Sequence, residues 1–151
     1  MYILLVDDDN DVRAAMGGVL ADAGHDVTQA ENGREAVSMA VAMKFDLGIV
    51  DIFMPTMDGL ETIRHFHRYL PRLPILAISG LRLRGGASAP RFLNAAIEFG
   101  AICALSKPFC SRELLCAVGS IDHLVVADTA ASASTARCDR SFSSEGASAP
   151  P

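Results

Sequence analysis

The sequence of 151 residues lacks tryptophan and holds only 6% aromatic residues, and it also lacks the markers of several large protein classes. No apolar run approaches the roughly 18 residues that a membrane-spanning helix needs, and the amino terminus has no signal-peptide pattern. The net charge is -5, and no basic stripe is present. We therefore expect a cytoplasmic protein with no membrane insertion and no direct binding of nucleic acid.

Cysteine spacing argues against a C-x-x-C redox protein and against a structural zinc site. The four cysteines form no C-x-x-C pair and no zinc-binding spacing with histidine. We expect reduced thiols, three of them in or near the core. The cysteines are Cys103, Cys110, Cys116 and Cys138.

What the sequence does contain is a regular alternation of short apolar runs and amphipathic helical patterns. Half of its residues are hydrophobic, enough to fill one core. The alternation repeats five times, and right-handed crossovers between successive strands then give an α/β fold with a parallel sheet covered on both faces. The expected strands are Tyr2–Val6, Asp26–Ala30, Leu47–Asp51, Pro74–Ser79 and Ile102–Leu105.

The composition changes after about Val126. The remaining residues are rich in alanine, serine and proline, and Phe142 is their only aromatic residue. Such a segment buries too little apolar surface to offset the entropy cost of ordering. We therefore expect one folded domain at residues 1–125 and a disordered tail at residues 126–151.

Polar side chains follow the expected strands where open parallel sheets bind their ligands, at the carboxyl ends. Asp7 and Asp8 follow the first strand, Asp51 ends the third, Ser79 ends the fourth and Lys107 follows the fifth. Three carboxylates held close together repel one another, so without a cation one of them should have a raised pKa. Acids and one lysine at a shared edge suggest a site for a divalent cation and a transferable phosphoryl group.

Most of these residues also have an ordinary structural explanation when taken alone. Acids after the first strand suit a helix N-terminus, Ser79 suits a turn, and Lys107 suits a solvated loop. Asp51 is harder to explain, because a carboxylate at the end of a core strand is costly without a partner. The combination therefore favours a binding site.

Asp7-Asp8, Asp51, Ser79 and Lys107-Pro108 occur in an order, and on elements, that resemble the receiver domain of two-component response regulators. The turn from Met54 to Gly59 adds to the likeness, and the resemblance covers about Tyr2–Val125. It implies a doubly wound, flavodoxin-like (β/α)5 fold with the strand order 2-1-3-4-5.

The resemblance also implies roles for the matching residues. Asp51 would be the phosphoacceptor, and Asp7, Asp8, Asp51 and the backbone carbonyl of Phe53 would hold Mg²⁺. Ser79 would donate its hydroxyl to the attached phosphoryl group. Lys107, at the position of the family's lysine, would spread the negative charge of the phosphoryl oxygens.

The same resemblance implies the partners. A sensor histidine kinase or a histidine phosphotransfer protein would donate the phosphoryl group. Output would run through a downstream protein target or through use of the domain as a phosphate sink. The protein would be no enzyme beyond its own phosphorylation and dephosphorylation.

Two features depart from the family's pattern. Many receivers have an aromatic residue two or three positions before the lysine, whereas Leu105 and Ala104 stand there. The segment Gly80–Ala89, which carries Arg82 and Arg84, is longer than expected. It suits a solvated loop, or a loop that folds over the phosphoryl group or meets a partner.

Three other interpretations stay open. The chain can be a receiver cut from a longer regulator. Asp7-Asp8-Asp9 loosely fits a phosphatase of the haloacid dehalogenase type, although Asp51 would then be unexplained and the chain leaves no room for a cap domain. A non-phosphorylated interaction module would be favoured by loss of an acid or of the lysine, but all are present.

Overall fold

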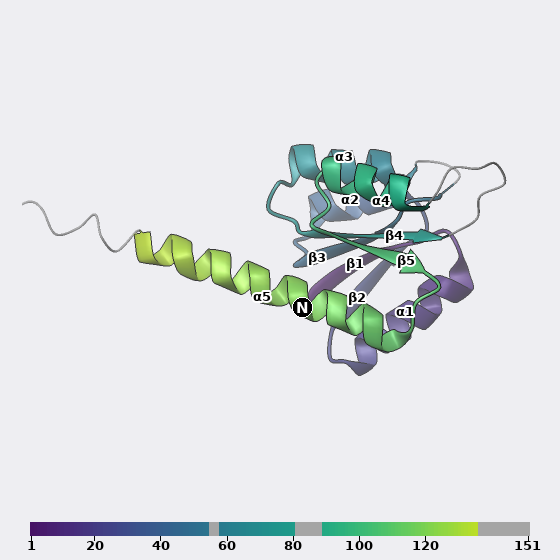
Figure 1. Ribbon diagram of the computed structural model, residues 1–151, viewed down its shortest axis with the longest axis horizontal. Helices are drawn as coiled ribbons and strands as arrows, with labels where there is room; N and C mark the ends of the chain where they lie inside the picture. The colour runs from purple at the N-terminus through teal and green to yellow at the C-terminus, as the bar shows by residue number, and fades with distance from the viewer. Residues whose placement is uncertain (55–57, 81–88, 136–151) are drawn as a thin grey trace, which may run out of the picture.

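The structure is a computed structural model that describes residues 1–54, 58–80 and 89–135. In these ranges five strands alternate with five helices (Figure 1). The strands are β1 (Tyr2–Val6), β2 (Asp26–Ala30), β3 (Leu47–Asp51), β4 (Ile75–Gly80) and β5 (Cys103–Lys107). The helices are α1 (Asn10–Asp22), α2 (Gly33–Ala42), α3 (Gly59–Tyr69), α4 (Ala89–Glu98) and α5 (Ser111–Thr135).

The strands form one parallel sheet in the order β2-β1-β3-β4-β5, which confirms the fold class and the strand order expected from the sequence. The register pairs Val6 of β1 with Val50 of β3, so the residues that follow them lie side by side. Gly80 of β4 pairs with Lys107 of β5 at the same edge. The topology thus brings four separated segments to one edge of the sheet.

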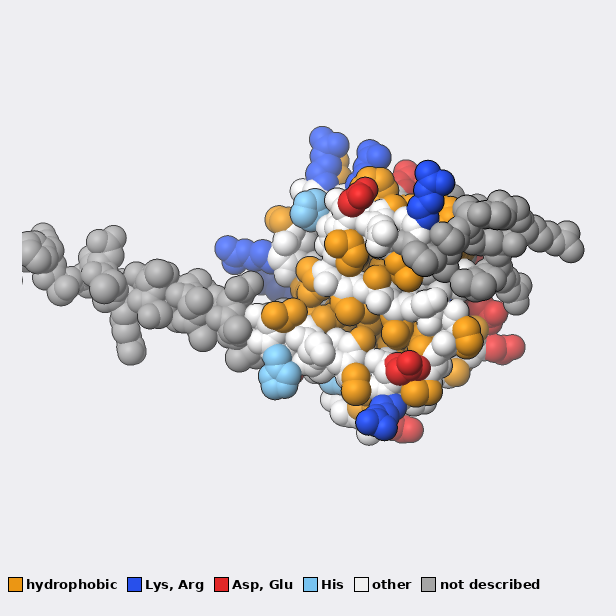
Figure 2. All heavy atoms as spheres, in the orientation of Figure 1, with side chains coloured by type: hydrophobic (Ala, Val, Ile, Leu, Met, Phe, Trp, Pro, Cys, Tyr) orange, Lys and Arg blue, Asp and Glu red, His pale blue; other side chains and the backbone are white. Residues whose placement is uncertain are grey.

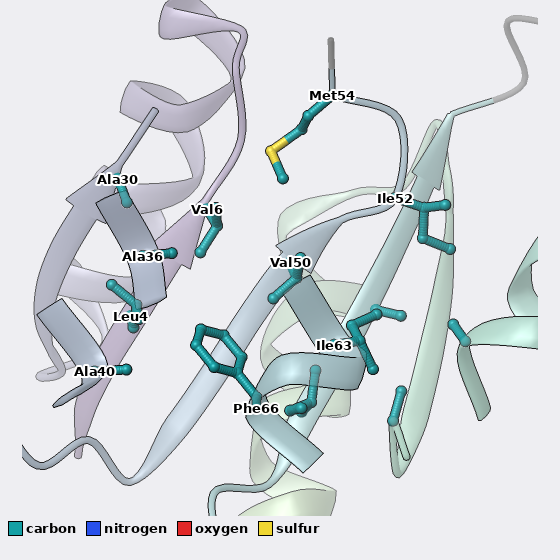
Figure 3. Packing of buried hydrophobic residues seen from close by; sticks show 14 residues of the cluster. Leu4, Val6, Ala30, Ala36, Ala40, Val50, Ile52, Met54, Ile63 and Phe66 are labelled. Atoms are coloured by element: carbon teal, nitrogen blue, oxygen red, sulfur yellow. The ribbon is translucent and has the colours of Figure 1, made fainter. Parts of the chain in front are cut away.

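Helices cover both faces of the sheet, because successive strand side chains point to opposite sides. Leu4 and Val6 pack with Phe66 of α3 in the core cluster beneath α2, α3 and α4 (Figure 3). Ile3 and Leu5 pack in a second cluster beneath α1 and α5. Each fully buried side chain of this size contributes about 1.5–3 kcal/mol, so both clusters hold the strand ends in place.

Three helices begin at polar caps that the sequence contains. Asp9 accepts hydrogen bonds from the backbone of Asp11 (3.0 Å) and Val12 (3.2 Å) at the start of α1. Asn32 accepts from the backbone of Glu35 at 2.9 Å at the start of α2, and Asp58 begins α3 in the same way. Such caps satisfy backbone groups that the first helical turn leaves without partners.

Helix α5 extends further than the composition predicts. We expect order to end at residue 125, whereas α5 continues to Thr135 and projects beyond the sheet (Figure 1). Alanine has the highest helix propensity, so an alanine-rich stretch can continue a helix without an apolar face to bury. Residues 136–151, and with them most of the expected tail, lie outside the described residues.

The cysteines differ from expectation in burial. Cys103 is partly buried, whereas Cys110 and Cys116 are exposed, and all three are free thiols. The expectation of three cysteines in or near the core is therefore wrong, because Cys110 precedes α5 and Cys116 lies on its outer side. Cys138 lies outside the described residues. None of the helices in the described ranges is long and apolar enough to cross a membrane.

Candidate functional site

The site lies at the carboxyl ends of β1, β3, β4 and β5. Asp7 and Ser79 are fully buried there, and Asp51 is 7% exposed, while Asp8 is exposed. Asp8 and Asp51 line an open cleft of about 400 Å³. Its lining residues are Asp8, Asp9, Val12, Asp51, Phe53, Gly80, Lys107 and Pro108.

Lys107 joins the two buried carboxylates. Its Nζ donates to Asp7 Oδ2 and to Asp51 Oδ2, each at 2.7 Å. Burial disfavours its charge, but the hydrogen bonds to Asp51 and Asp7 and their negative charges outweigh that effect and raise the pKa of Lys107 above its usual 10.5. Lys107 is therefore a fixed ammonium group that partly neutralises the two acids.

Backbone groups orient the remaining carboxylate oxygens. Asp7 Oδ1 accepts from the backbone N–H of Asp9 at 2.9 Å, and Asp51 Oδ1 accepts from that of Phe53 at 3.1 Å. Burial nevertheless raises the pKa of Asp51 above 3.8, against the hydrogen bonds and charge of Lys107, and the charge of Asp7 raises it further. The direction agrees with the raised pKa predicted from the sequence, but its main cause is burial rather than the repulsion on which that prediction rested.

The donor set fits a small divalent cation. Asp7, Asp8 and Asp51 each offer one carboxylate oxygen, and these oxygens lie within 4.8 Å of one another. Unit charges about 4 Å apart repel by about 4 kcal/mol at an effective dielectric constant of about 20. One ammonium group cannot balance three carboxylates, and Mg²⁺ prefers carboxylate oxygens while keeping several waters. The exposure of Asp8 leaves room for those waters.

The hydroxyl of Ser79 also points to a bound group with acceptor oxygens. Its Oγ is buried and has no hydrogen-bond partner in the part of the chain that the structure describes. A buried hydroxyl without a partner costs about 1–3 kcal/mol. Ser79 lies beside Gly80, which lines the acidic cleft, so an entering group with acceptor oxygens would suit it.

Gly59, which the sequence placed only in a turn, lies directly against the end of β3. A Cβ on Gly59 would lie 1.9 Å from the carbonyl oxygen of Asp51, and its backbone N–H donates to the carbonyl of Ile52 at 2.9 Å. The chain therefore returns against the end of β3 in a way that only glycine permits. The signal was present as the glycine after Asp58, but a local pattern does not show what it contacts.

Three further contacts, made by Arg13 and Phe53, were also missed. Arg13 donates to the carbonyl oxygen of Asp7 at 2.5 Å and to the side chain of Asn10. The ring of Phe53 packs against Phe92 of α4 in a T-shaped contact, with centroids 4.9 Å apart. The sequence pointed only to the carbonyl of Phe53. The loop expected at residues 80–89 lies largely outside the described residues.

The fold and the site together define a CheY-like, doubly wound α/β domain with an acidic pocket at its strand ends. The family model described as the response regulator receiver domain matches residues 3–119. The chain belongs to this family.

Individual relatives agree. The chain is similar to the response regulator receiver protein CpdR of Brucella abortus, with 37% identity over 128 residues, covering 83% of this chain and 97% of CpdR. It is 34% identical to the response regulator MprA of Mycolicibacterium vanbaalenii over 89% of this chain, but spans only 55% of that relative. The solved chemotaxis protein CheY4 of Vibrio cholerae matches with a TM-score of 0.71 and 30% identity, covering 80% of this chain and 97% of CheY4.

Membership of the family fixes the general role. Receiver domains are phosphoacceptors in two-component signalling, they typically catalyse no reaction on other substrates, and their partners are histidine kinases. An acidic triad such as Asp7, Asp8 and Asp51 is typical of the receiver magnesium site. The match favours a receiver over the phosphatase alternative.

Proposed function

We propose that this receiver accepts a phosphoryl group on Asp51 from a sensor histidine kinase or a histidine phosphotransfer protein. The observation that carries the proposal is the position of Asp51. It is a buried carboxylate at a cleft, hydrogen-bonded to Lys107 and grouped with two further acids. Its strand partner Ile78 directly precedes Ser79, whose buried hydroxyl has no hydrogen-bond partner among the described residues. A structural aspartate needs no such surroundings.

The reaction follows from these groups. A carboxylate oxygen of Asp51 attacks the phosphorus atom of phosphohistidine, a P–O bond forms, and the P–N bond breaks with its electron pair passing to the imidazole nitrogen. Lys107 offsets negative charge on the phosphoryl oxygens, and Ser79 donates its hydroxyl to one of them. Mg²⁺, when held by Asp7, Asp8, Asp51 and the carbonyl of Phe53, supplies further positive charge for the phosphoryl oxygens.

We further propose that the domain works in the cytoplasm beside its kinase. It would pass the signal on by contact with a downstream protein or by acting as a phosphate sink. Attachment of the phosphoryl group adds negative charge and acceptor oxygens at the strand ends, and such a change can reorganise neighbouring segments.

The direct test is labelling with acetyl phosphate and Mg²⁺, followed by intact-mass spectrometry. We expect one phosphoryl adduct on the wild type and none on Asp51→Asn, because the amide keeps the shape but is no nucleophile. Asp58→Asn is the matched control, since Asp58 caps α3 through Glu61 and should leave labelling unchanged. Equal labelling of Asp51→Asn would contradict the proposal.

A further inference from the structure

Phe53 connects the phosphoacceptor site to α4 through three of its groups. Its backbone N–H donates to Asp51 Oδ1 at 3.1 Å, and its carbonyl is the proposed cation ligand. Its ring, 37% exposed, packs edge-on against Phe92 with an interplanar angle of 70°. A shift of the Phe53 backbone, which holds both of these groups, therefore also carries its ring against Phe92.

Phe92 in turn belongs to a helix that is anchored to the sheet. Its ring packs against the core cluster that contains Ala96 of the same helix, which is fully buried. Both aromatic rings also line a cleft of about 400 Å³ that reaches Asp8 and Asp58, so the pair has space to rearrange. Ala104 of β5 packs against that same cluster but has no ring to turn.

We propose that Phe92 is a positioning residue for phosphorylation, acting through Phe53 on Asp51 and on the cation, and that the same contact carries a change at Asp51 to α4. The inference rests on the proposed function. When Asp51 becomes an acyl phosphate, its oxygens no longer offer the same acceptor to the N–H of Phe53. The backbone of Phe53 must adjust, and its ring moves against Phe92.

Coupling of this kind acts in both directions. If modification of Asp51 changes the position of α4, then the position of α4 must change the free energy of the modified state by the same amount. An aromatic pair contributes beyond its buried area by an amount that corresponds to about a 2- to 10-fold change in an equilibrium or rate. Removal of one ring should therefore have a moderate effect on labelling.

The test uses Phe92→Leu, which keeps apolar bulk but removes the ring. We expect its single-turnover labelling by acetyl phosphate to slow about 2- to 10-fold. We also expect the change in amide exchange that beryllofluoride causes in α4 to shrink. Phe99→Leu is the matched control, because Phe99 packs against the same core cluster outside the cleft at the site; it should leave both measurements unchanged.

A double-mutant cycle separates coupling from general destabilisation. The double variant Phe53→Leu, Phe92→Leu should label no more slowly than Phe53→Leu alone, because the contact is already lost. Additive effects, or equal behaviour of Phe92→Leu and Phe99→Leu, would overturn the inference. If Phe92→Leu does not fold, Phe92→Met takes its place. Absence of labelling on Asp51 of the wild type would instead refute the proposed function.

Discussion

The two ends of the strands differ in where they place charged side chains; we call the end that carries the site the carboxyl edge and the opposite end the amino edge. At the carboxyl edge Asp7, Asp51 and Ser79 are buried. At the amino edge the exposed Asp46 accepts a hydrogen bond from the backbone of Tyr2 at 2.7 Å and stays in water. Figure 2 shows acidic side chains at the right-hand end, where the strand arrows of Figure 1 point, and lysine or arginine side chains at the upper left.

Buried polar side chains at the carboxyl edge lower the stability of the fold. Among the described residues the buried polar side chains are Asp7, Asp51, Ser79 and Thr62, and Thr62 donates to the carbonyl of Asp58 at 3.1 Å. The other three gather at one edge, with mutual repulsion and one hydroxyl without a partner among the described residues. Both edges consist of strand ends, so strand ends alone do not define the site. The buried carboxylates, whose charge Lys107 balances only in part, distinguish the carboxyl edge.

The largest expected effect comes from removal of Lys107. Lys107→Met leaves Asp7 and Asp51 buried without their shared partner, which should lower the free energy of unfolding at pH 7 by about 3 kcal/mol. Urea unfolding without added metal measures this. The matched change at the amino edge, Asp46→Asn, should cost less than about 1 kcal/mol. Equal losses at the two edges would contradict the comparison.

Two glycines, Gly48 within β3 and Gly59 packed against its end, compare the two edges by the space around them. Gly59→Ala places a Cβ against the backbone of Asp51 and should cost about 2 kcal/mol by overpacking. Gly48→Ala at the amino edge meets no atom closer than 3.7 Å and should be close to neutral. Urea unfolding of both variants measures this, and a well-tolerated Gly59→Ala would show that the turn can adjust.

Added Mg²⁺ should stabilise the wild type by mass action, by about 1.4 kcal/mol at a concentration ten times its dissociation constant. Thermal melting with and without the metal measures the gain. Asp8→Ala should abolish it, because Asp8 is one of the three grouped acids, whereas Asp46→Ala should keep it. The same gain in Asp8→Ala would place the metal elsewhere.

The smallest effect concerns Asp51 and pH. Its pKa is raised in the fold, so its contribution to stability is fully present below pH 3.8 and is lost as the pH rises through the folded pKa. Metal-free Asp51→Asn should therefore melt slightly above the wild type at pH 7, and the gap should close as the pH falls toward 3.8. A gap of the opposite sign at pH 7 would contradict the raised pKa.

Local pattern was enough to predict much of the fold. The bounds of β1, β2 and β3 agree with the expected strands, since apolar runs and polar ends are encoded within each segment. β4 begins one residue later, at Ile75, because Pro74 has no N–H to donate to the ladder. The gathering of the acids and Lys107 followed from topology, because parallel strand ends share one edge.

The remaining contacts depend on tertiary packing. The sequence around Phe53 does not show that Phe92 of α4 will contact it. The sequence around Gly59 likewise does not show how closely the end of β3 will approach. The extent of α5 also escaped prediction, because in an alanine-rich stretch helix propensity favours a helix whereas the composition predicts little apolar surface to stabilise it.

Because Lys107 belongs to the last strand, the order of synthesis matters for the site. A growing chain presents Asp7 and Asp51 long before β5 leaves the ribosome, and until then the acids have no ammonium group to hold them together. Chains that stop before β5 should be poor targets for a kinase. Assembly of the site therefore depends on the fifth strand joining the sheet, because that strand carries Lys107.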